Sequence, residues 1–435
     1  MAPEPRVVKE TFTRLESDPA GAMSYFYGRL FAAEPRLRAL FPPAMGAHHD
    51  RFFHALTRLV WSQDNPEELA RHLGRLGRGH RKHGVLREHY PAVEGALIAT
   101  LRTFAADVWT TEAEDAWTAA YRSAAATMIE AAERDAAGAP PWWVAEVAGH
   151  DRRAGDLAVL TLRPERPVPF RPGQHVTVQT PRWPRVWRPY WIANAPRSDG
   201  MLRLHVRARP GGWVSGALVR HTVPGDTVLL GPAAGPMALD PGSRRGLLLI
   251  GGGTGLAPMK ALAEQAASPF QEMWEVDPRT GGRRARDVRL LVGAGGPHDL
   301  YDLDDLRLLE SACARLRVTV ALSRPPEPGS GPGQGPDVLR GRVPDVLPGF
   351  LDGLPGSEDR DAYVAGPVPF VRDTVTALQR HGMPLTRIHH DLLTAEDDEP
   401  GETRDAAVTS PRAPAGSRSS PRPPDRTTRS PAPPP

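Results

Sequence analysis

Residues 247–258 read LLLIGGGTGLAP, and this stretch decides the fold of the second half of the chain. The apolar run Leu247 to Ile250 has the length and composition of a buried strand. The glycines of residues 251–255 follow at once, and a helical pattern begins at Pro258. Glycine lets a backbone approach a pyrophosphate closely, and a helix N-terminus offers N–H groups and a positive dipole end. A strand, a glycine loop and a helix in this order predict a nucleotide-binding unit.

Two further signals precede the glycine loop. Arg188-Pro189-Tyr190 places an arginine and an aromatic ring two residues apart, and residues 211–215 read GGWVS. A glycine loop alone is weak evidence for a dinucleotide site. It becomes strong evidence when residues suited to a phosphate and to a flavin ring come before it. Together the three signals predict a module that handles hydride between a nicotinamide and a flavin.

The spacing of apolar residues divides the chain into domains. Residues 1–138 have a helical period throughout, since apolar residues recur every three or four positions. From residue 139 to 236 the period is two, with Pro-Gly turns, which predicts a small antiparallel barrel. From 237 to 393 strands alternate with helices, which predicts a doubly wound α/β domain. Residues 394–435 are rich in Pro, Ser, Thr and Arg, so we expect a disordered tail. The expected strands of the α/β domain are Leu247–Ile250, Val288–Val292, Val318–Leu322 and Tyr363–Val364, with a surface loop over 267–286.

Composition limits the classes of function. The chain has 435 residues, 40% of them hydrophobic, which is enough for two or three domains with their own cores. A net charge of +3 argues for neither nucleic acid nor membrane as a partner. The single cysteine, Cys313, excludes a four-cysteine iron–sulfur cluster within the chain, so electron transfer needs another cofactor. Because neither a signal peptide nor an apolar run of membrane-spanning length is visible, we expect a cytoplasmic protein, and we expect a monomer.

The barrel and the α/β domain together resemble the ferredoxin–NADP reductase superfamily. The resemblance implies that Arg188 neutralises the pyrophosphate of FAD, that the ring of Tyr190 packs on the isoalloxazine, and that Gly212 and Ser215 contact the second phosphate. It also implies that four residues of the glycine loop meet NAD(P)H and that a Gly-Pro pair borders the nicotinamide. These residues are Gly252, Gly253, Thr254 and Gly255, and the pair Gly366 and Pro367.

Three positions depart from the pattern of that superfamily. Trp191 stands where the family has a serine near the flavin N5, and Ala365 stands where a cysteine is common. No aromatic residue that would shield the flavin is obvious after residues 388–393. All three lie where hydride would move, and a displacement of about 1 Å there costs about 100-fold in rate. The coenzyme stays open between NADH and NADPH, although Ser323-Arg324 could hold a 2′-phosphate.

The helical domain carries the features of a haem protein. Residues 26–31, FYGRLF, and the Leu-Phe-Pro of 40–42 resemble the second helix and following corner of bacterial globins, where a phenylalanine, here Phe41, packs on the porphyrin. His80 precedes Tyr90 by ten residues, a spacing similar to the proximal helix and following tyrosine of flavohaemoglobins. The resemblance therefore implies that His80 ligates the haem iron, for which imidazole is a natural partner.

The residues alone leave other interpretations of the proximal side open. Residues 71–83 form a basic stretch, in which a histidine is usually just solvated, and His83 is the next candidate ligand. Flavohaemoglobins also place a glutamate from the last helix beside the proximal histidine. Ala132 aligns with that position, and Glu130 and Glu133 are out of register. A missing carboxylate would weaken the support that raises the basicity of the imidazole.

The distal side is implied by the same resemblance. Tyr27 would point its hydroxyl at bound oxygen, and His48 occupies the position that usually carries a glutamine. Phe52, one helical turn further on, would wall the pocket. His49 offers a competing register for His48, and all of these residues could instead be ordinary core residues of amphipathic helices.

A globin, an FAD barrel and an NAD(P) domain in this order resemble a flavohaemoglobin over almost the whole chain. This implies a multidomain fold with haem b, FAD and NAD(P)H as cofactors, and oxygen and nitric oxide as substrates. The implied activity is NAD(P)H-dependent oxidation of nitric oxide to nitrate. Two alternatives stay open: a haem-free flavin reductase that serves an oxygenase, and a haem-based oxygen or nitric oxide sensor with a slow reductase half.

Overall fold

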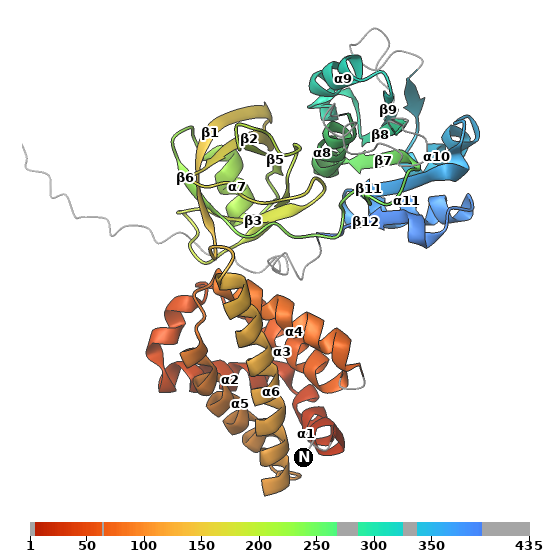
Figure 1. Cartoon of the computed structure of the whole chain (residues 1–435). Helices are drawn as coiled ribbons and strands as arrows, with labels where there is room; N and C mark the ends of the chain where they lie inside the picture. Colours follow the sequence, from red (N-terminus) through yellow and green to blue (C-terminus); the bar gives the residue numbers. More distant parts are fainter. Residues whose placement is uncertain (1–4, 63–64, 268–285, 325–336, 394–435) are drawn as a thin grey trace, which may run out of the picture. The chain divides into compact units, whose positions relative to one another are not determined.

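The computed structural model describes residues 5–62, 65–267, 286–324 and 337–393 (Figure 1). The expected disordered tail, 394–435, and nearly all of the expected loop at 267–286 lie outside the described residues. The limits given above for the four domains stay predictions. The chain has helical, antiparallel and parallel parts in the predicted order.

The first part is helical, as its apolar period predicts. Asp18 starts one helix by accepting a hydrogen bond from the amide of Gly21, and Asn65 starts another by accepting from the amide of Glu68. A proline follows each of these caps and fixes the first helical residue. The described α-helices are α1 (Pro5–Glu16), α2 (Pro19–Ala33), α3 (Gly46–Trp61), α4 (Pro66–Arg81), α5 (Tyr90–Phe104) and α6 (Thr111–Ala136).

The second part is a six-stranded sheet of antiparallel strands, in the order β4-β3-β6-β1-β2-β5. An antiparallel bridge between Ile192 and Leu204 joins the end of β4 to β5, so the sheet closes on itself. Inward-facing residues such as Val176, Leu160 and Leu204 form its core. The elements are β1 (Trp143–Ala154), β2 (Leu157–Pro164), β3 (His175–Gln179), β4 (Arg188–Trp191), β5 (Leu202–Arg207), α7 (Trp213–Arg220) and β6 (Thr227–Leu230).

The third part is a parallel sheet with the strand order β10-β9-β8-β7-β11-β12. From β7 the chain adds strands on one side up to β10, then crosses to the other side of β7 with β11. The carboxyl ends of β7 and β11 therefore meet at the switch point, where open α/β sheets bind their ligands. The elements are β7 (Gly246–Gly252), α8 (Leu256–Ala267), β8 (Val288–Ala294), α9 (Leu303–Ala312), β9 (Leu316–Leu322), β10 (Val338–Arg340), α10 (Val343–Asp352), β11 (Arg360–Ala365), α11 (Val368–Arg380) and β12 (Ile388–His390).

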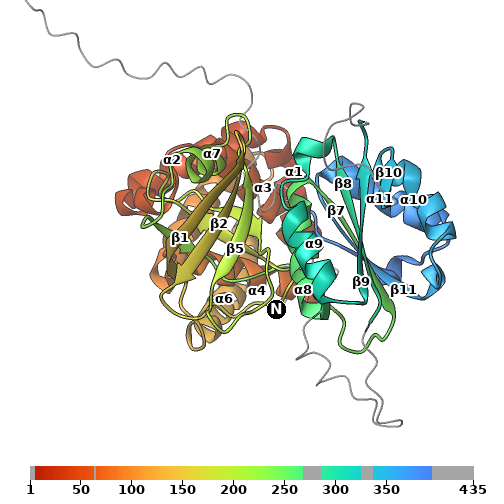
Figure 2. The same ribbon diagram turned by 90° about the horizontal axis from the view of Figure 1, so that it is seen from above.

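Helices cover both faces of this sheet (Figure 2). Leu247 and Leu249 pack in the same cluster as residues of α8 and α9, whereas Leu248 and Ile250 pack with residues of α10 and α11. Strands buried on both faces read as continuous apolar runs, which is why the Leu-Leu-Leu-Ile run predicts this layout. The four predicted strands are confirmed. The short strands β10 and β12 were not predicted, because three residues are too few to show a period.

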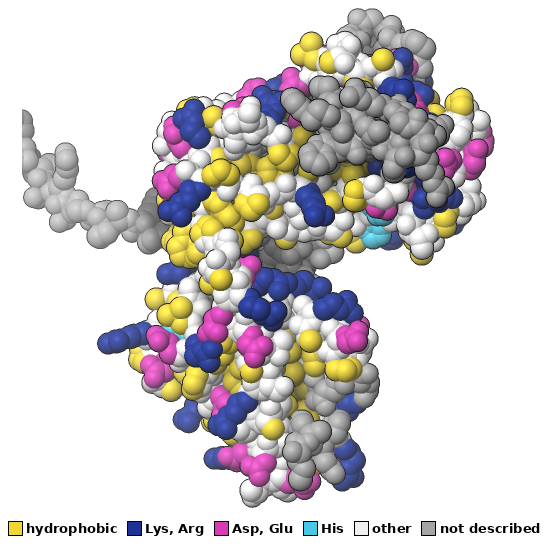
Figure 3. All heavy atoms as spheres, viewed as in Figure 1, with side chains coloured by type: hydrophobic (Ala, Val, Ile, Leu, Met, Phe, Trp, Pro, Cys, Tyr) yellow, Lys and Arg dark blue, Asp and Glu magenta, His cyan; other side chains and the backbone are white. Residues whose placement is uncertain are grey.

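One apolar cluster contains residues of both the barrel and the parallel sheet. Leu157, Val159, Trp191 and Ala193 of the barrel belong to the same buried cluster as Leu256 and other residues of the α/β part. The two parts are therefore joined by a continuous core. No helix among the described residues is long and apolar enough to cross a membrane. Figure 3 shows hydrophobic side chains gathered over the barrel, while the helical domain presents a mixture of charged and apolar groups on the same side.

Candidate functional site

His80 lies in the last turn of α4, and its Nδ1 atom is 3.4 Å from the hydroxyl of Tyr90, the first residue of α5. The hydroxyl of Tyr121 donates to the backbone carbonyl of Tyr90 at 2.9 Å, so α6 fixes the position of that tyrosine. Burial, together with the nearby charge of Lys82, lowers the pKa of His80 to about 4. The imidazole is therefore neutral at physiological pH. When Nδ1–H donates to Tyr90, the lone pair of Nε2 is available to a metal.

The helix that carries His80 is held close to α6. A Cβ atom on Gly77, one turn before His80, would overlap the backbone of Met128, so only glycine permits this approach. The carboxylate of Glu133 binds Arg87 at 2.7 Å on the surface, and therefore it is engaged away from the imidazole.

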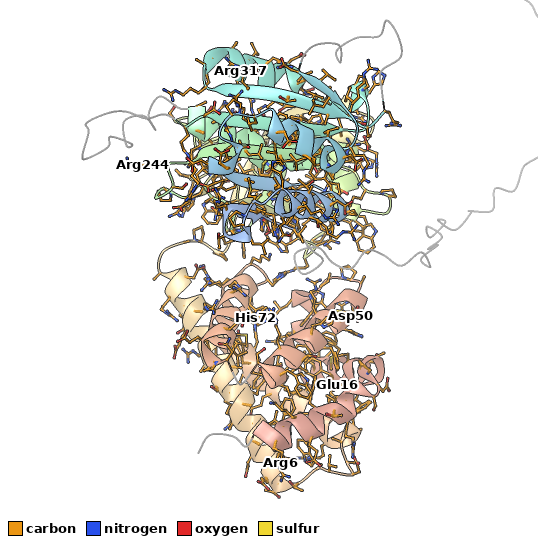
Figure 4. All side chains as sticks on the ribbon, turned by 90° about the vertical axis from the view of Figure 1, so that its right-hand side faces the viewer. Arg6, Glu16, Asp50, His72, Arg244 and Arg317 are labelled. Carbon is orange, nitrogen blue, oxygen red and sulfur yellow. The ribbon has the colours of Figure 1, made fainter. Side chains whose placement is uncertain are left out.

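The distal residues come from three segments and meet around Tyr27. Its hydroxyl donates to the backbone carbonyl of His48 at 3.3 Å, and its ring stacks on His49 at 4.9 Å between centroids. The rings of Phe41 and Phe52 lie edge-on to Tyr27, at 5.6 and 6.2 Å. Burial raises the pKa of Tyr27, and so the phenol keeps its proton. Figure 4 labels Asp50 on α3 and His72 on α4, the helices that carry the distal and proximal histidines.

His49 contacts Tyr27, although the sequence analysis named His49 only as an alternative to His48 at the distal position. The structure puts the ring of His49 against Tyr27, while His48 contributes its carbonyl to Tyr27 and packs its ring edge-on to Phe41 at 5.6 Å. Phe26, stacked on Phe52 at 4.4 Å, is also part of this aromatic group. A helical period predicts that these residues face inward but does not say which ring meets which.

Arg188 and Tyr190 lie on β4, two residues apart, and therefore project from the same face of the strand. Trp191 projects from the opposite face, directly across from His175 of β3. Trp191 is 8% exposed and shares a buried cluster with Ala365. Its indole N–H is buried and has no hydrogen-bond partner among the described residues. Two of the three departures from the reductase pattern, Trp191 and Ala365, are therefore members of one core.

The second glycine segment starts α7. The hydroxyl of Ser215 accepts from the amide of Arg209 at 3.2 Å and donates to the carbonyl of Gly212 at 3.4 Å, so this side chain fixes the shape of its own loop. Gly212, the residue before the helix, provides no side-chain cap. The first N–H groups of a helix have no partner within the helix, and an anion is well suited to them.

The glycines of the third segment have different surroundings. Gly253 has a left-handed backbone, with φ of +56°, and open space where a Cβ would stand. A Cβ on Gly255 would overlap the backbone of Ala365, so this glycine lets two loops pack together. A Cβ on Gly252 would come within 2.9 Å of the ring of Phe370, and one on Gly366 within 2.7 Å. The open approach to a ligand is therefore at Gly253, next to Thr254.

Phe370 and a buried polar cluster are site features that sequence reasoning missed. Phe370 lies in the first turn of α11, shortly after the predicted Gly366-Pro367 pair, so that pair was the sequence signal that could have pointed to Phe370.

In the buried polar cluster, His205 Nδ1 lies 2.9 Å from the hydroxyl of Tyr301, which is itself 3.5 Å from the carbonyl of Gly253. Lys260 completes it by binding two carboxylates, those of Asp302 at 2.7 Å and Asp305 at 2.8 Å. Burial and the nearby Lys260 lower the pKa of His205, whereas burial raises that of Asp302. No sequence signal links these residues, because they meet only through the tertiary fold.

These observations fit the three expected cofactors. A neutral imidazole oriented by a tyrosine suits haem iron, and the aromatic rings around Tyr27 suit an apolar porphyrin. An uncapped helix start, the Arg188–Tyr190 pair and a buried indole N–H without a partner suit a flavin dinucleotide. An open glycine at the switch point suits a nicotinamide dinucleotide.

Comparison with known proteins gives the same three parts. Residues 24–128 match the globin family, 146–237 the oxidoreductase FAD-binding domain, and 249–376 the oxidoreductase NAD-binding domain. The flavohemoprotein of Bordetella pertussis is 29% identical over 423 residues, covering 90% of this chain and 98% of that protein. The xylene/toluene monooxygenase electron transfer component of Pseudomonas putida is 32% identical over 233 residues, covering 53% of this chain and 60% of that protein.

A solved structure has the same fold over nearly the whole described chain. It is a flavohaemoglobin of Malassezia yamatoensis with bound FAD and haem, with a TM-score of 0.67 and 17% identity, covering 90% of this chain and 98% of that one. The fold and the matched domains define a globin joined to an FAD- and NAD-dependent oxidoreductase module. The chain has the domain organisation of the flavohaemoglobins and is similar to flavohemoproteins over 90% of its length. Its cofactors are haem, FAD and NAD(P)H, and it is an oxidoreductase with the electron-transfer architecture of that family.

Proposed function

We propose that the protein is a nitric oxide dioxygenase, which uses NAD(P)H and oxygen to convert nitric oxide to nitrate. The observation that carries the proposal is the pairing of His80 with Tyr90 on one side, and of Tyr27 with His48 and His49 on the other, within a globin joined to a reductase. When bound, the haem supplies an oxygen-binding iron, and FAD converts a two-electron hydride donor into single-electron steps.

In this proposal the proximal residues set the iron's surroundings. His80 offers Nε2 to the iron, and Tyr90 holds the imidazole in the tautomer that leaves this nitrogen unprotonated. On the distal side Tyr27 would supply the hydrogen-bond donor for oxygen, since its protonated hydroxyl lies 3.3 Å from the His48 carbonyl. Phe41 and Phe52 keep water from the pocket, because their rings surround Tyr27.

The reductase residues bind and orient the coenzymes. Arg188 and the start of α7 at Gly212 and Ser215 hold the FAD pyrophosphate, and Tyr190 packs against the isoalloxazine. The other coenzyme occupies the open side of Gly253 and Thr254, between the β7 and β11 ends. In this arrangement Gly252 and Gly255 shape the loop, and Gly366 with Pro367 borders the nicotinamide.

The test measures nitric oxide consumption by the purified holoprotein in air, with NADH and with NADPH. We expect one nitrate for each nitric oxide consumed, loss of the activity without oxygen, and loss of the activity in His80→Ala. Consumption that continues without oxygen, or products other than nitrate, would contradict the proposal. The expected cytoplasmic location and monomeric state stay predictions.

A second candidate is a haem-based oxygen or nitric oxide sensor with a slow reductase half. Trp191 and Ala365 favour it, because both replace residues expected at the hydride-transfer position and both lie in one buried cluster. Rapid reduction of the haem by anaerobic NADH or NADPH would exclude the sensor. A haem-free reductase that serves an oxygenase is the other alternative, and a Soret band in the purified protein would exclude it.

A further inference from the structure

Two tryptophans of the barrel stack on one another. Trp183 lies on the loop between β3 and β4, and Trp213 is the first residue of α7. Their ring centroids are 4.7 Å apart and their planes differ by 18°. Both rings are partly buried and pack against the barrel core, so each has one part supported by the core and another part open.

This aromatic pair joins the two segments that carry the FAD phosphate candidates. Trp213 directly follows Gly212, at the uncapped start of α7. Trp183 belongs to the loop that leads, five residues later, to Arg188 on β4. The stack therefore brings together the residue that directly follows Gly212 and the loop that leads to Arg188.

A dinucleotide has a ring system at each end of its pyrophosphate. Tyr190 is the aromatic residue expected for the isoalloxazine, and it is separate from the stacked pair. The other ring system of FAD is adenine, which needs a flat, half-open aromatic surface close to the phosphates. Bases stack well on such surfaces, because every base presents a π face.

We propose that Trp183 and Trp213 form an adenine platform, on which the adenine of FAD stacks. The proposal rests on the FAD site described above and adds to it the contact that distinguishes FAD from FMN. Since FMN lacks the adenosine half, the platform contributes to the binding of FAD alone. The isoalloxazine and its phosphate keep their own contacts, which both flavins share.

The experiment compares the two flavins on the full-length protein after removal of bound FAD. FAD and FMN are each titrated into wild type, Trp213→Ala, Trp183→Ala and Trp213→Phe, and flavin fluorescence gives the dissociation constants. Loss of a base–aromatic stack corresponds to about a 5- to 150-fold change in dissociation constant. We expect that increase for FAD in both alanine variants, an unchanged constant for FMN, and a constant near wild type for FAD in Trp213→Phe.

Trp142→Ala is the matched control, because Trp142 is a 36% exposed tryptophan of the same barrel outside the stack. An equal increase for FAD and FMN would show that the pair only supports the barrel and would overturn the platform. An unchanged constant for FAD would overturn it as well. If Trp213→Ala does not fold, Trp183→Ala decides by the same ratio of FAD to FMN. A wild-type protein that binds neither flavin would overturn the FAD site itself, and the platform with it.

Discussion

The Nδ1 atom of His80 lies 3.4 Å from the phenolic oxygen of Tyr90, while Tyr121 holds the backbone of Tyr90 from the last helix of the domain. One ring nitrogen of the histidine is thereby committed to a hydrogen bond, and the other keeps its lone pair. A buried tyrosine with a raised pKa stays protonated and orients the ring without adding charge. The arrangement orients the imidazole but does not add the negative charge that a carboxylate partner would supply.

The first prediction concerns this histidine. His80→Ala removes the imidazole and should abolish stable haem binding, while FAD remains bound because its residues lie on the barrel. The haem-to-FAD ratio, measured by haem extraction and flavin absorbance, checks it. His83→Ala is the control and should keep its haem. A full haem complement with unchanged ligand spectra in His80→Ala would move the ligand to His83.

The second prediction concerns oxygen retention. Tyr27→Phe should accelerate oxygen dissociation from the ferrous haem, because the hydroxyl donor is lost. A hydrogen bond of roughly 1–2 kcal/mol corresponds to about a 5- to 30-fold faster release. Stopped-flow displacement of oxygen by carbon monoxide measures the rate. Tyr25→Phe is the control, since Tyr25 lies on the same helix with a hydroxyl that faces Thr103 at 3.2 Å. An unaltered rate in Tyr27→Phe would direct the test to His48.

The third prediction concerns hydride transfer. Trp191→Ser should raise the rate of FAD reduction by NAD(P)H with little change in FAD content, because a large buried ring leaves the core that contains Ala365. Anaerobic stopped-flow absorbance of the flavin gives the rate. Trp191→Phe keeps most of the bulk and should reduce about as slowly as wild type. A slower rate, or loss of FAD, would mean that Trp191 is an adapted part of the flavin site, and the sensor alternative would lose its main support.

The fourth prediction concerns acid stability. Burial and the charge of Lys260 lower the pKa of His205 well below its usual value, so the folded protein keeps this imidazole neutral. The unfolded chain takes up a proton on it below a pH of about 6.5. The unfolded state therefore binds more protons as the pH falls from about 6.5, and the free energy of unfolding decreases in that range.

His205→Gln should reduce this decrease, which thermal unfolding of the two proteins between about pH 7 and pH 5 would show. Asp302 has a raised pKa and acts in the opposite direction, but it is present in both proteins, so the difference between them isolates His205. Identical pH dependence in His205→Gln and wild type would contradict the assignment.

The sequence by itself determined the three-part fold. A helical period, then an alternating period, then an apolar strand before glycines are properties of neighbouring residues, and local geometry alone converts them into helices, an antiparallel sheet and a nucleotide-binding unit. The apolar run Leu247–Ile250 predicted both a strand at these residues and the burial of that strand on two faces. The family resemblance singled out His80 and Tyr90, and the structure brings these two residues within hydrogen-bond range.

Only the tertiary structure decided which side chains meet across distant segments. It put His49, rather than His48, against the Tyr27 ring, set Phe370 beside Gly252, and joined His205 to Tyr301 across 96 positions of the chain. Such contacts depend on how strands and helices are offset when they pack, and a shift of one residue turns a side chain to another face. The period of apolar residues predicts which face of a helix or strand is buried. Which side chain it contacts across the core is determined only when the helices and strands pack against one another.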